Sequence, residues 1–278
     1  MLDPQPLYEQ IGPFLMVLFR LSGLFLFAPL LSSSIIPTAA RVLLVCIFTF
    51  ALYPTLPHAQ RVPIHLDIFS LAPAVFCETL IGLAIGLLAS LPMFAAQLGG
   101  QIMGQQAGFS LGQVYNPSLD TDADLFGQLM QYIAMFAFVA AGGLEVLFLA
   151  LANTFSRVPV ATPTSGLAPL DLILGVTGSG FDLALRVSAP VLCIIFIETL
   201  ASSILMKTIP QINTQSIGFA TKIIVSFLAL IAGIAAIAQA VNDDVLHTNS
   251  QIVKWSLNLV DPPPTQPHAP SAPFNGGR

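Results

Sequence analysis

Six ionisable residues lie inside long apolar runs of the sequence, and their types limit the chemistry that the chain could perform. They are three acids and three bases, namely Arg20, Glu78, Glu145, Arg186, Glu198 and Lys222. An ionisable group in hydrocarbon is costly unless it is paired or faces a protein interior. Equal numbers of acids and bases permit ion pairs between helices, an interpretation that we favour over a proton or substrate path. Spacing alone does not say which residues pair.

Catalytic constellations are missing from the sequence. All four histidines lie outside the apolar runs, which leaves no candidate for an intramembrane Ser/His pair or a zinc motif. No Asp lies well inside such a run, and the stretch "GVTGSG" at 175–180 lacks the Lys of a phosphate-binding loop. The three cysteines, Cys46, Cys77 and Cys193, have no metal-ligand spacing. We therefore expect a protein without enzymatic activity, metal or other cofactor.

Neutral polar residues form the most unusual pattern, between positions 97 and 124. Gln97, Gln101 and Gln105 recur every four residues and would form one stripe on a helix, beside a second stripe of Gly100, Gly104 and Gly108. Lipid would leave the primary amides without hydrogen bonds, so the glutamine stripe suits a wet surface lined by protein. Gly82 and Gly86 repeat the spacing that lets membrane helices approach closely, and we predict that they serve helix packing.

From Gly108 onward the residue types favour turns over helix, with Gly, Ser, Asn-Pro and Asp in "GFSLGQVYNPSLDTD". A loop at membrane depth is tolerated only where it is buried in protein or lines a cavity. The interspersed apolar residues Phe109, Leu111, Val114 and Tyr115 would let this loop close on itself or on a ring of partners.

Composition indicates the elements that position these residues. Hydrophobic residues make up 55% of the chain and charged residues 8%, with a mean hydropathy of +0.83 and a net charge of −5, which excludes a water-soluble fold and gives no sign of nucleic-acid binding. We predict an all-α, polytopic integral membrane protein. Its expected apolar segments, some of them broken or paired as hairpins, are 12–31, 39–56, 71–98, 127–155, 183–206 and 217–241.

Two further segments follow the last expected span. An amphipathic helix is expected from Asp243 to Leu259, and the Pro-rich residues 261–278 read as a disordered tail. The distribution of Lys and Arg between alternate loops does not decide the orientation in the membrane.

Several motifs together resemble one family. They are "FRLSGLFLFAPLL" near the start, "ETLIGLAIG" at 78–86, "QLGGQIMGQQAGFSLGQVYNP" at 97–117, "SAPVLCIIFIETL" at 188–200 and "IPQINTQSIGFATKI" at 209–223. With them the chain is similar to the FliR/SctT family of type III secretion export-gate components, over nearly all of residues 5–260. The resemblance implies a protein of the bacterial inner membrane and the flagellar basal body. It would be part of the export gate, through which unfolded flagellar substrates pass.

The resemblance also implies an organisation and partners. Residues 1–180 would form a FliP-like part and residues 181–260 a FliQ-like hairpin with an amphipathic helix. The chain would close a ring of FliP and FliQ in a helical hetero-oligomer. The loop around Pro210, Gln211 and Asn213 would contact FliQ or FlhB, since its amides offer hydrogen bonds to a neighbour.

The loop at about 106–124 would be a plug in the export channel, reached along a helix lined by the glutamines. The plug residues would be Phe109, Leu111, Val114, Tyr115, Asn116 and Pro117. Three alternatives stay open from the sequence: the equivalent component of an injectisome, a purely structural scaffold, and a secondary transporter of a small solute.

Overall fold

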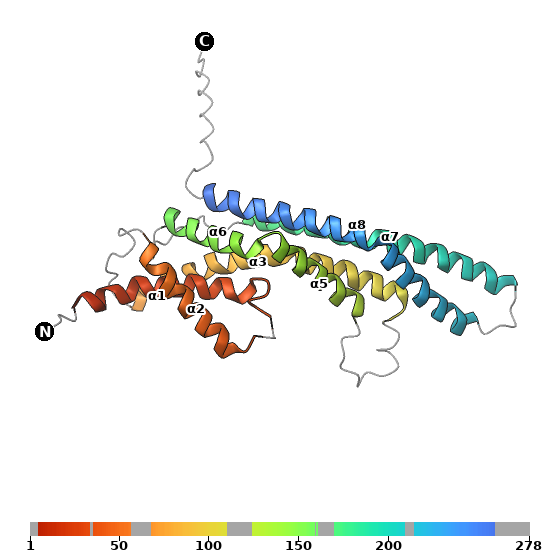
Figure 1. The fold of residues 1–278 in the computed structure, drawn as a ribbon, viewed down its shortest axis with the longest axis horizontal. Coiled ribbons are helices and arrows are strands. Elements are labelled where there is room, and N and C mark those ends of the chain that lie inside the picture. Colours follow the sequence, from red (N-terminus) through yellow and green to blue (C-terminus); the bar gives the residue numbers. More distant parts are fainter. Residues whose placement is uncertain are drawn as a thin grey trace, which may run out of the picture.

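The computed structural model describes residues 5–33, 36–56, 68–109, 124–158, 160, 170–208 and 214–258, and the regular elements in these ranges are all helices (Figure 1). They are α1 (Gln5–Phe27), α2 (Thr38–Leu52), a 3₁₀ turn η1 (Tyr53–Thr55), α3 (Ile68–Ala107), α5 (Leu125–Ala140), α6 (Gly143–Arg157), α7 (Leu170–Thr208) and α8 (Thr214–Asn258). The predicted all-α fold class is confirmed.

Four of the described stretches are long and apolar enough to cross a membrane: Thr38–Thr55, Leu71–Ala107, Ile173–Leu205 and Gly218–Leu257. The helices α5 and α6 form a fifth candidate only as a pair, because they are bent by 63° at the break between them. Gly142 adopts a φ of 69° at this break, a conformation that glycine reaches without steric cost. The apolar run at 127–155, expected as one segment, is therefore two helices.

The amphipathic segment from Asp243 is not a separate helix. It continues α8, which runs without interruption from Thr214 to Asn258. The segment buries Val245, Thr248 and Ile252 against the rest of the protein, while neighbouring polar residues stay exposed. No Pro or Gly lies between Gly233 and Asn258, so no residue of low helix propensity ends the helix before Asn258.

Helix α3 is the central element of an elongated bundle. It contacts α1, α5, α6, α7 and α8, while α7 and α8 pack together and run side by side along most of the molecule (Figure 1). The core along α3 contains fully buried side chains such as Ile85, Leu88 and Met103. Burial of these apolar surfaces against neighbouring helices fixes the arrangement.

Close approach of α1 and α3 depends on glycine. A Cβ atom added to Gly82 would overlap the carbonyl oxygen of Arg20, and one added to Gly86 would lie 2.7 Å from the carbonyl oxygen of Leu24. A Cβ atom on Gly23, on the α1 side, would overlap the carbonyl oxygen of Thr79. The two backbones therefore touch along this seam, as small residues permit.

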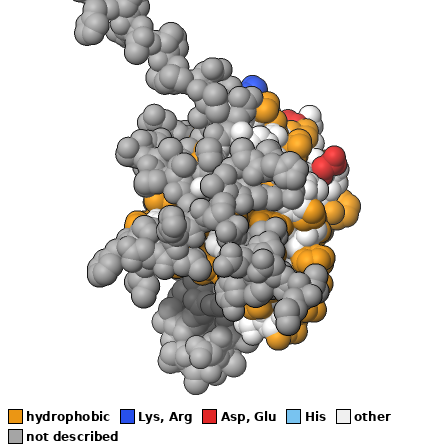
Figure 2. Space-filling model, turned by 90° about the vertical axis from the view of Figure 1, so that its left-hand side faces the viewer, with side chains coloured by type: hydrophobic (Ala, Val, Ile, Leu, Met, Phe, Trp, Pro, Cys, Tyr) orange, Lys and Arg blue, Asp and Glu red, His pale blue; other side chains and the backbone are white. Residues whose placement is uncertain are grey.

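Much of the surface is apolar. Figure 2 shows the end of the molecule that lies to the left in Figure 1, and where described residues are visible there, hydrophobic side chains predominate. Large exposed side chains include Phe50 on α2 and Phe136 on α5, each 77% exposed. Such surfaces need lipid or protein neighbours, because contiguous apolar patches of this kind are unfavourable in water.

Candidate functional site

The candidate site begins on the last turns of α3. Gln97 and Gln101 are half-buried and Gln105 is exposed, so the glutamine stripe lies on the less covered side of the helix. The glycine stripe lies on the packed side, where a Cβ atom added to Gly100 would lie 2.5 Å from the carbonyl oxygen of Phe126. A Cβ atom on Gly104 would meet only ordinary contacts, at 3.7 Å or more. The stripes thus separate a polar face from a packing face.

Helix α3 ends in a glycine cap. Gly108 adopts a φ of 94°, its N–H donates to the carbonyl oxygen of Gln105 at 3.1 Å, and the N–H of Phe109 donates to the carbonyl oxygen of Gly104 at 3.1 Å. This pair of bonds is the Schellman arrangement, which satisfies the last carbonyl groups of a helix. The prediction that helical geometry ends at Gly108 is confirmed.

Phe109, directly after the cap, packs in an aromatic cluster with one ring from α5 and one from α8. Its centroid lies 5.4 Å from that of Phe126 and 5.9 Å from that of Phe227, and these two rings lie 5.3 Å apart. These separations are typical of attractive aromatic pairs. The first predicted plug residue is therefore held by neighbouring helices. Leu111, Val114, Tyr115, Asn116 and Pro117 lie outside the described residues.

Asp124 lies immediately before the first residue of α5. Its side chain Oδ1 accepts a hydrogen bond from the N–H of Gly127 at 2.9 Å and caps the start of α5. The adjoining Phe126 contacts Phe109, so the chain leaves and re-enters the helical body at one place. From the sequence, Asp124 was interpreted as part of a solvated loop end, but an Asp immediately before an apolar helix is a known N-cap signal, and this signal could have predicted its role.

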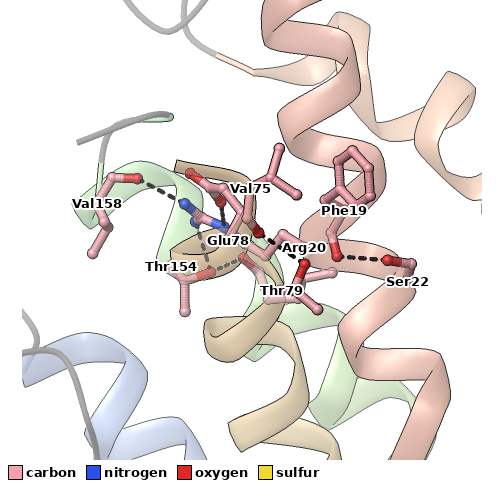
Figure 3. Close-up of polar contacts among 9 residues, drawn as sticks. Phe19, Arg20, Ser22, Val75, Glu78, Thr79, Thr154 and Val158 are labelled. Carbon is pink, nitrogen blue, oxygen red and sulfur yellow. Dashed lines mark hydrogen bonds and ion pairs between the residues drawn. The ribbon is translucent and has the colours of Figure 1, made fainter. Parts of the chain in front are cut away.

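A second polar site lies within the bundle, where Arg20 of α1 is fully buried (Figure 3). Its Nε atom lies 2.5 Å from Oε2 of Glu78 on α3. Its other nitrogens donate to Oγ1 of Thr154 at 3.2 Å and to the carbonyl oxygen of Val158 at 3.4 Å. The guanidinium also lies over the ring of Phe155, 4.2 Å from its centroid. One side chain therefore joins α1, α3 and the end of α6.

The other intramembrane ionisable residues are placed differently. Arg186 lies 2.6 Å from Asp182, one turn earlier on α7, and both side chains are mostly exposed. For Arg186 the predicted buried pair between helices is wrong, because an acid of its own helix lies within reach and α7 presents this face outward. Glu198 accepts a hydrogen bond from Ser202 at 2.7 Å, Glu145 is exposed and Lys222 is half-buried.

The predicted partner loop has no structural account. Pro210, Gln211 and Asn213 lie outside the described residues. Among the described residues no group of His, Cys, Asp and Glu side chains is arranged to hold a metal ion.

Residues 11–248 match the family model of "Bacterial export proteins, family 1", a range that includes both polar sites. The chain belongs to this family. Among similar members of family 1 is the flagellar biosynthetic protein FliR of Bacillus subtilis, 28% identical over 81% of this chain and 86% of the relative. FliR of Escherichia coli is 30% identical over 73% of this chain and 76% of the relative. The Yop proteins translocation protein T of Yersinia pestis is 25% identical over 78% and 83%.

Proposed function

We propose that this family 1 export protein is a membrane component of the flagellar type III protein export gate. The observation that carries the proposal is the family match over residues 11–248. The two relatives named FliR support flagellar service and share 28% and 30% identity with the chain. Its apolar helices suit a place in the bacterial inner membrane.

Within this role, the end of α3 is proposed to line the export channel and the residues from about 106 to 124 to plug it. A channel for unfolded chains of any sequence needs neutral, weakly binding walls and an apolar constriction. Gln97, Gln101 and Gln105 supply uncharged hydrogen-bonding groups on the less covered side of α3. The glycine cap at Gly108 then redirects the chain out of helical geometry.

The proposed partners are FliP, FliQ and FlhB, with residues 1–180 as the FliP-like part and 181–260 as the FliQ-like part. The large exposed apolar side chains support a hetero-oligomer, since neighbouring membrane proteins would cover them. In this role the chain closes the ring around the channel and acts without enzymatic chemistry.

Site-specific photocrosslinking tests the channel lining. A photoreactive residue replaces Gln105 in cells that carry a flagellar substrate fused to a tightly folded domain, which stalls in the channel. We expect adducts with the substrate at Gln105. Phe136 on α5, 77% exposed, is the matched control and should give none. Stalled substrate with no adduct at Gln105 would show that the glutamine face lies outside the channel.

Shortening the chain between Gly108 and Asp122 tests the plug. Phe109 is kept in the shortened chain, because its ring contacts Phe126 and Phe227. Helices α3 and α5 should still pack, because their direct contacts lie outside the deleted stretch, so complex yield should stay near normal. Membranes with the shortened chain should leak small solutes at rest. A complex that assembles and stays sealed would exclude the plug role and leave the channel-lining role standing.

An injectisome component is the second candidate function, favoured by the 25% identity to the Yop proteins translocation protein T. Deletion of the gene separates the two candidates. Loss of flagellar filaments with normal secretion of virulence proteins supports the flagellar gate, and the opposite outcome supports the injectisome. A chain that purifies as a stable monomer and moves a small solute would contradict both.

A further inference from the structure

The aromatic cluster of Phe109, Phe126 and Phe227 joins the end of α3 to α8 as well as to α5. The Phe109 ring lies 5.9 Å from that of Phe227 on α8 and 5.4 Å from that of Phe126 on α5, between centroids. Phe126 and Phe227 are themselves in contact, at 5.3 Å. Three helices therefore meet immediately after the glycine cap at Gly108 (Figure 1).

Phe219 makes a second contact between α8 and the same part of α3. A Cβ atom added to Gly108 would lie 2.9 Å from Cε2 of Phe219, so this ring lies against the backbone of the cap. Phe219 and Phe227 are eight positions apart, a spacing that places both on one broad face of a helix. That face of α8 is turned toward the end of α3.

The first turns of α8 have few other contacts with the bundle. From 218 to 225 every residue is exposed or half-buried, and full burial begins at Ser226. Segments with few buried apolar contacts separate from a fold at low free-energy cost. The aromatic contacts therefore contribute a large share of the packing between this part of α8 and the end of α3.

We infer that Phe227 and Phe219 are positioning residues for the glycine cap and the glutamine face. They act through Phe109 and Gly108, which they hold in one place relative to α5 and α8. The chain then leaves the end of α3 from a fixed point, and α8 contributes to the resting seal without lining the channel. The inference rests on the proposed function, in which the residues that follow the cap close the channel.

Phe227→Ala tests this positioning in the assembled membrane complex. It removes two aromatic contacts, so we expect the N–H groups of Gly108 and Phe109 to exchange with deuterium about tenfold faster. Membranes with this variant should leak small solutes at rest, although complex yield stays near normal. Phe227→Tyr keeps the ring and should keep both the slow exchange and the seal. Unchanged exchange in Phe227→Ala would overturn the inference.

Phe219→Ala is the milder variant, for use where Phe227→Ala lowers complex yield. The Phe219 ring is 39% exposed, so its removal should disturb the bundle less and raise both exchange at the cap and leakage by a smaller factor. Exchange at the cap that stays at the wild-type rate in Phe219→Ala would likewise contradict the inference.

Phe48→Ala is the matched control, because the Phe48 ring stacks on that of Phe148 at 4.7 Å and joins α2 to α6, away from the end of α3 (Figure 1). This variant also loses an aromatic contact between helices, but exchange at the cap and the seal should not change. Leakage as large as that of Phe227→Ala would mean that loss of any such contact opens the membrane, and the inference would be wrong.

The chain shortened between Gly108 and Asp122 separates failure of the inference from failure of the proposed function. If Phe227→Ala speeds exchange at the cap but stays sealed while the shortened chain leaks, the plug stands and the inference is wrong. If the shortened chain is sealed as well, the plug role is wrong and the inference fails with it.

Discussion

Two arginine–carboxylate pairs in this protein share their chemistry and differ in their surroundings. Arg20 and Glu78 come from different helices and are almost completely buried, while Arg186 and Asp182 lie one turn apart on α7 and are mostly exposed. Breaking a buried pair leaves an uncompensated charge inside the protein, whereas an exposed pair is screened by its environment. The comparison shows that the residue types allow a pair, but burial decides how much the pair contributes to holding the helices together.

The largest expected effect comes from breaking the buried pair. Arg20→Met should destabilise the protein by about 3–5 kcal/mol, because the carboxylate of Glu78 then stays buried without its cation. The measurement is thermal unfolding of the purified protein in detergent. The double variant Arg20→Met/Glu78→Met should recover much of the loss, since it buries no lone charge. Equal stability of the two variants would mean that packing around Arg20, and not its charge, holds the three helices.

The next effect tests the α1–α3 seam that positions the buried pair. Gly82→Ala should destabilise the protein by about 1–3 kcal/mol, because its Cβ atom would overlap the backbone of Arg20. Gly178→Ala on α7 is the matched control. A Cβ atom there meets nothing within 4 Å, so this variant should gain up to about 1 kcal/mol from helix propensity. Unfolding in detergent measures the stability of both variants. If both variants were destabilised, or both stabilised, the close packing at Gly82 and the open space at Gly178 would not explain the result.

A smaller effect is expected at the start of α5, where the chain returns to the helical body. Asp124→Ala removes the side-chain acceptor for the N–H of Gly127 and should cost about 1 kcal/mol. Asp124→Asn keeps an acceptor at this position and should cost less. Hydrogen exchange of the first turn of α5 measures the change locally. Faster exchange spread evenly over the protein would argue against a capping role.

The smallest stability effect is expected from the exposed pair. Arg186→Gln should change the free energy of unfolding of the isolated chain by about 0.5 kcal/mol or less, because exposed pairs one helical turn apart contribute little. Thermal unfolding compares this variant with Arg20→Met. A loss from Arg186→Gln that approaches the loss from Arg20→Met would remove the contrast between the two pairs.

Particular residues show how far the sequence could predict this structure. The apolar runs predict the helical membrane fold, and the turn residues after Ala107 predict the end of α3 at Gly108, because local residue types decide both. The break between α5 and α6 also has a local signal, the pair Gly142 and Gly143, which a hydropathy pattern alone overlooks.

Contacts between segments that are distant in the sequence could not be predicted from local residue types. Residues 20 and 78 pair because α1 and α3 pack in one register, and no local spacing encodes that register. The aromatic contact between Phe109 and Phe227 depends equally on where α8 lies. The continuation of α8 through Asp243 and Asp244 was missed because polar residues suggested a boundary, whereas packing of Val245 and Ile252 against the bundle sustains the helix.

The lengths of α3, α7 and α8 have a mechanical consequence. They contain 40, 39 and 45 residues, and at a rise of about 1.5 Å per residue each measures roughly 60 Å or more. Even at a tilt of about 40° such a helix spans roughly 45 Å along the bilayer normal, against a hydrocarbon thickness of about 30 Å. Each helix therefore extends well beyond the hydrocarbon. In a bare bilayer this excess is hydrophobic mismatch, and neighbouring chains that cover the overhanging apolar surface relieve it. Relief of mismatch is thus a driving force for assembly that acts independently of any single contact.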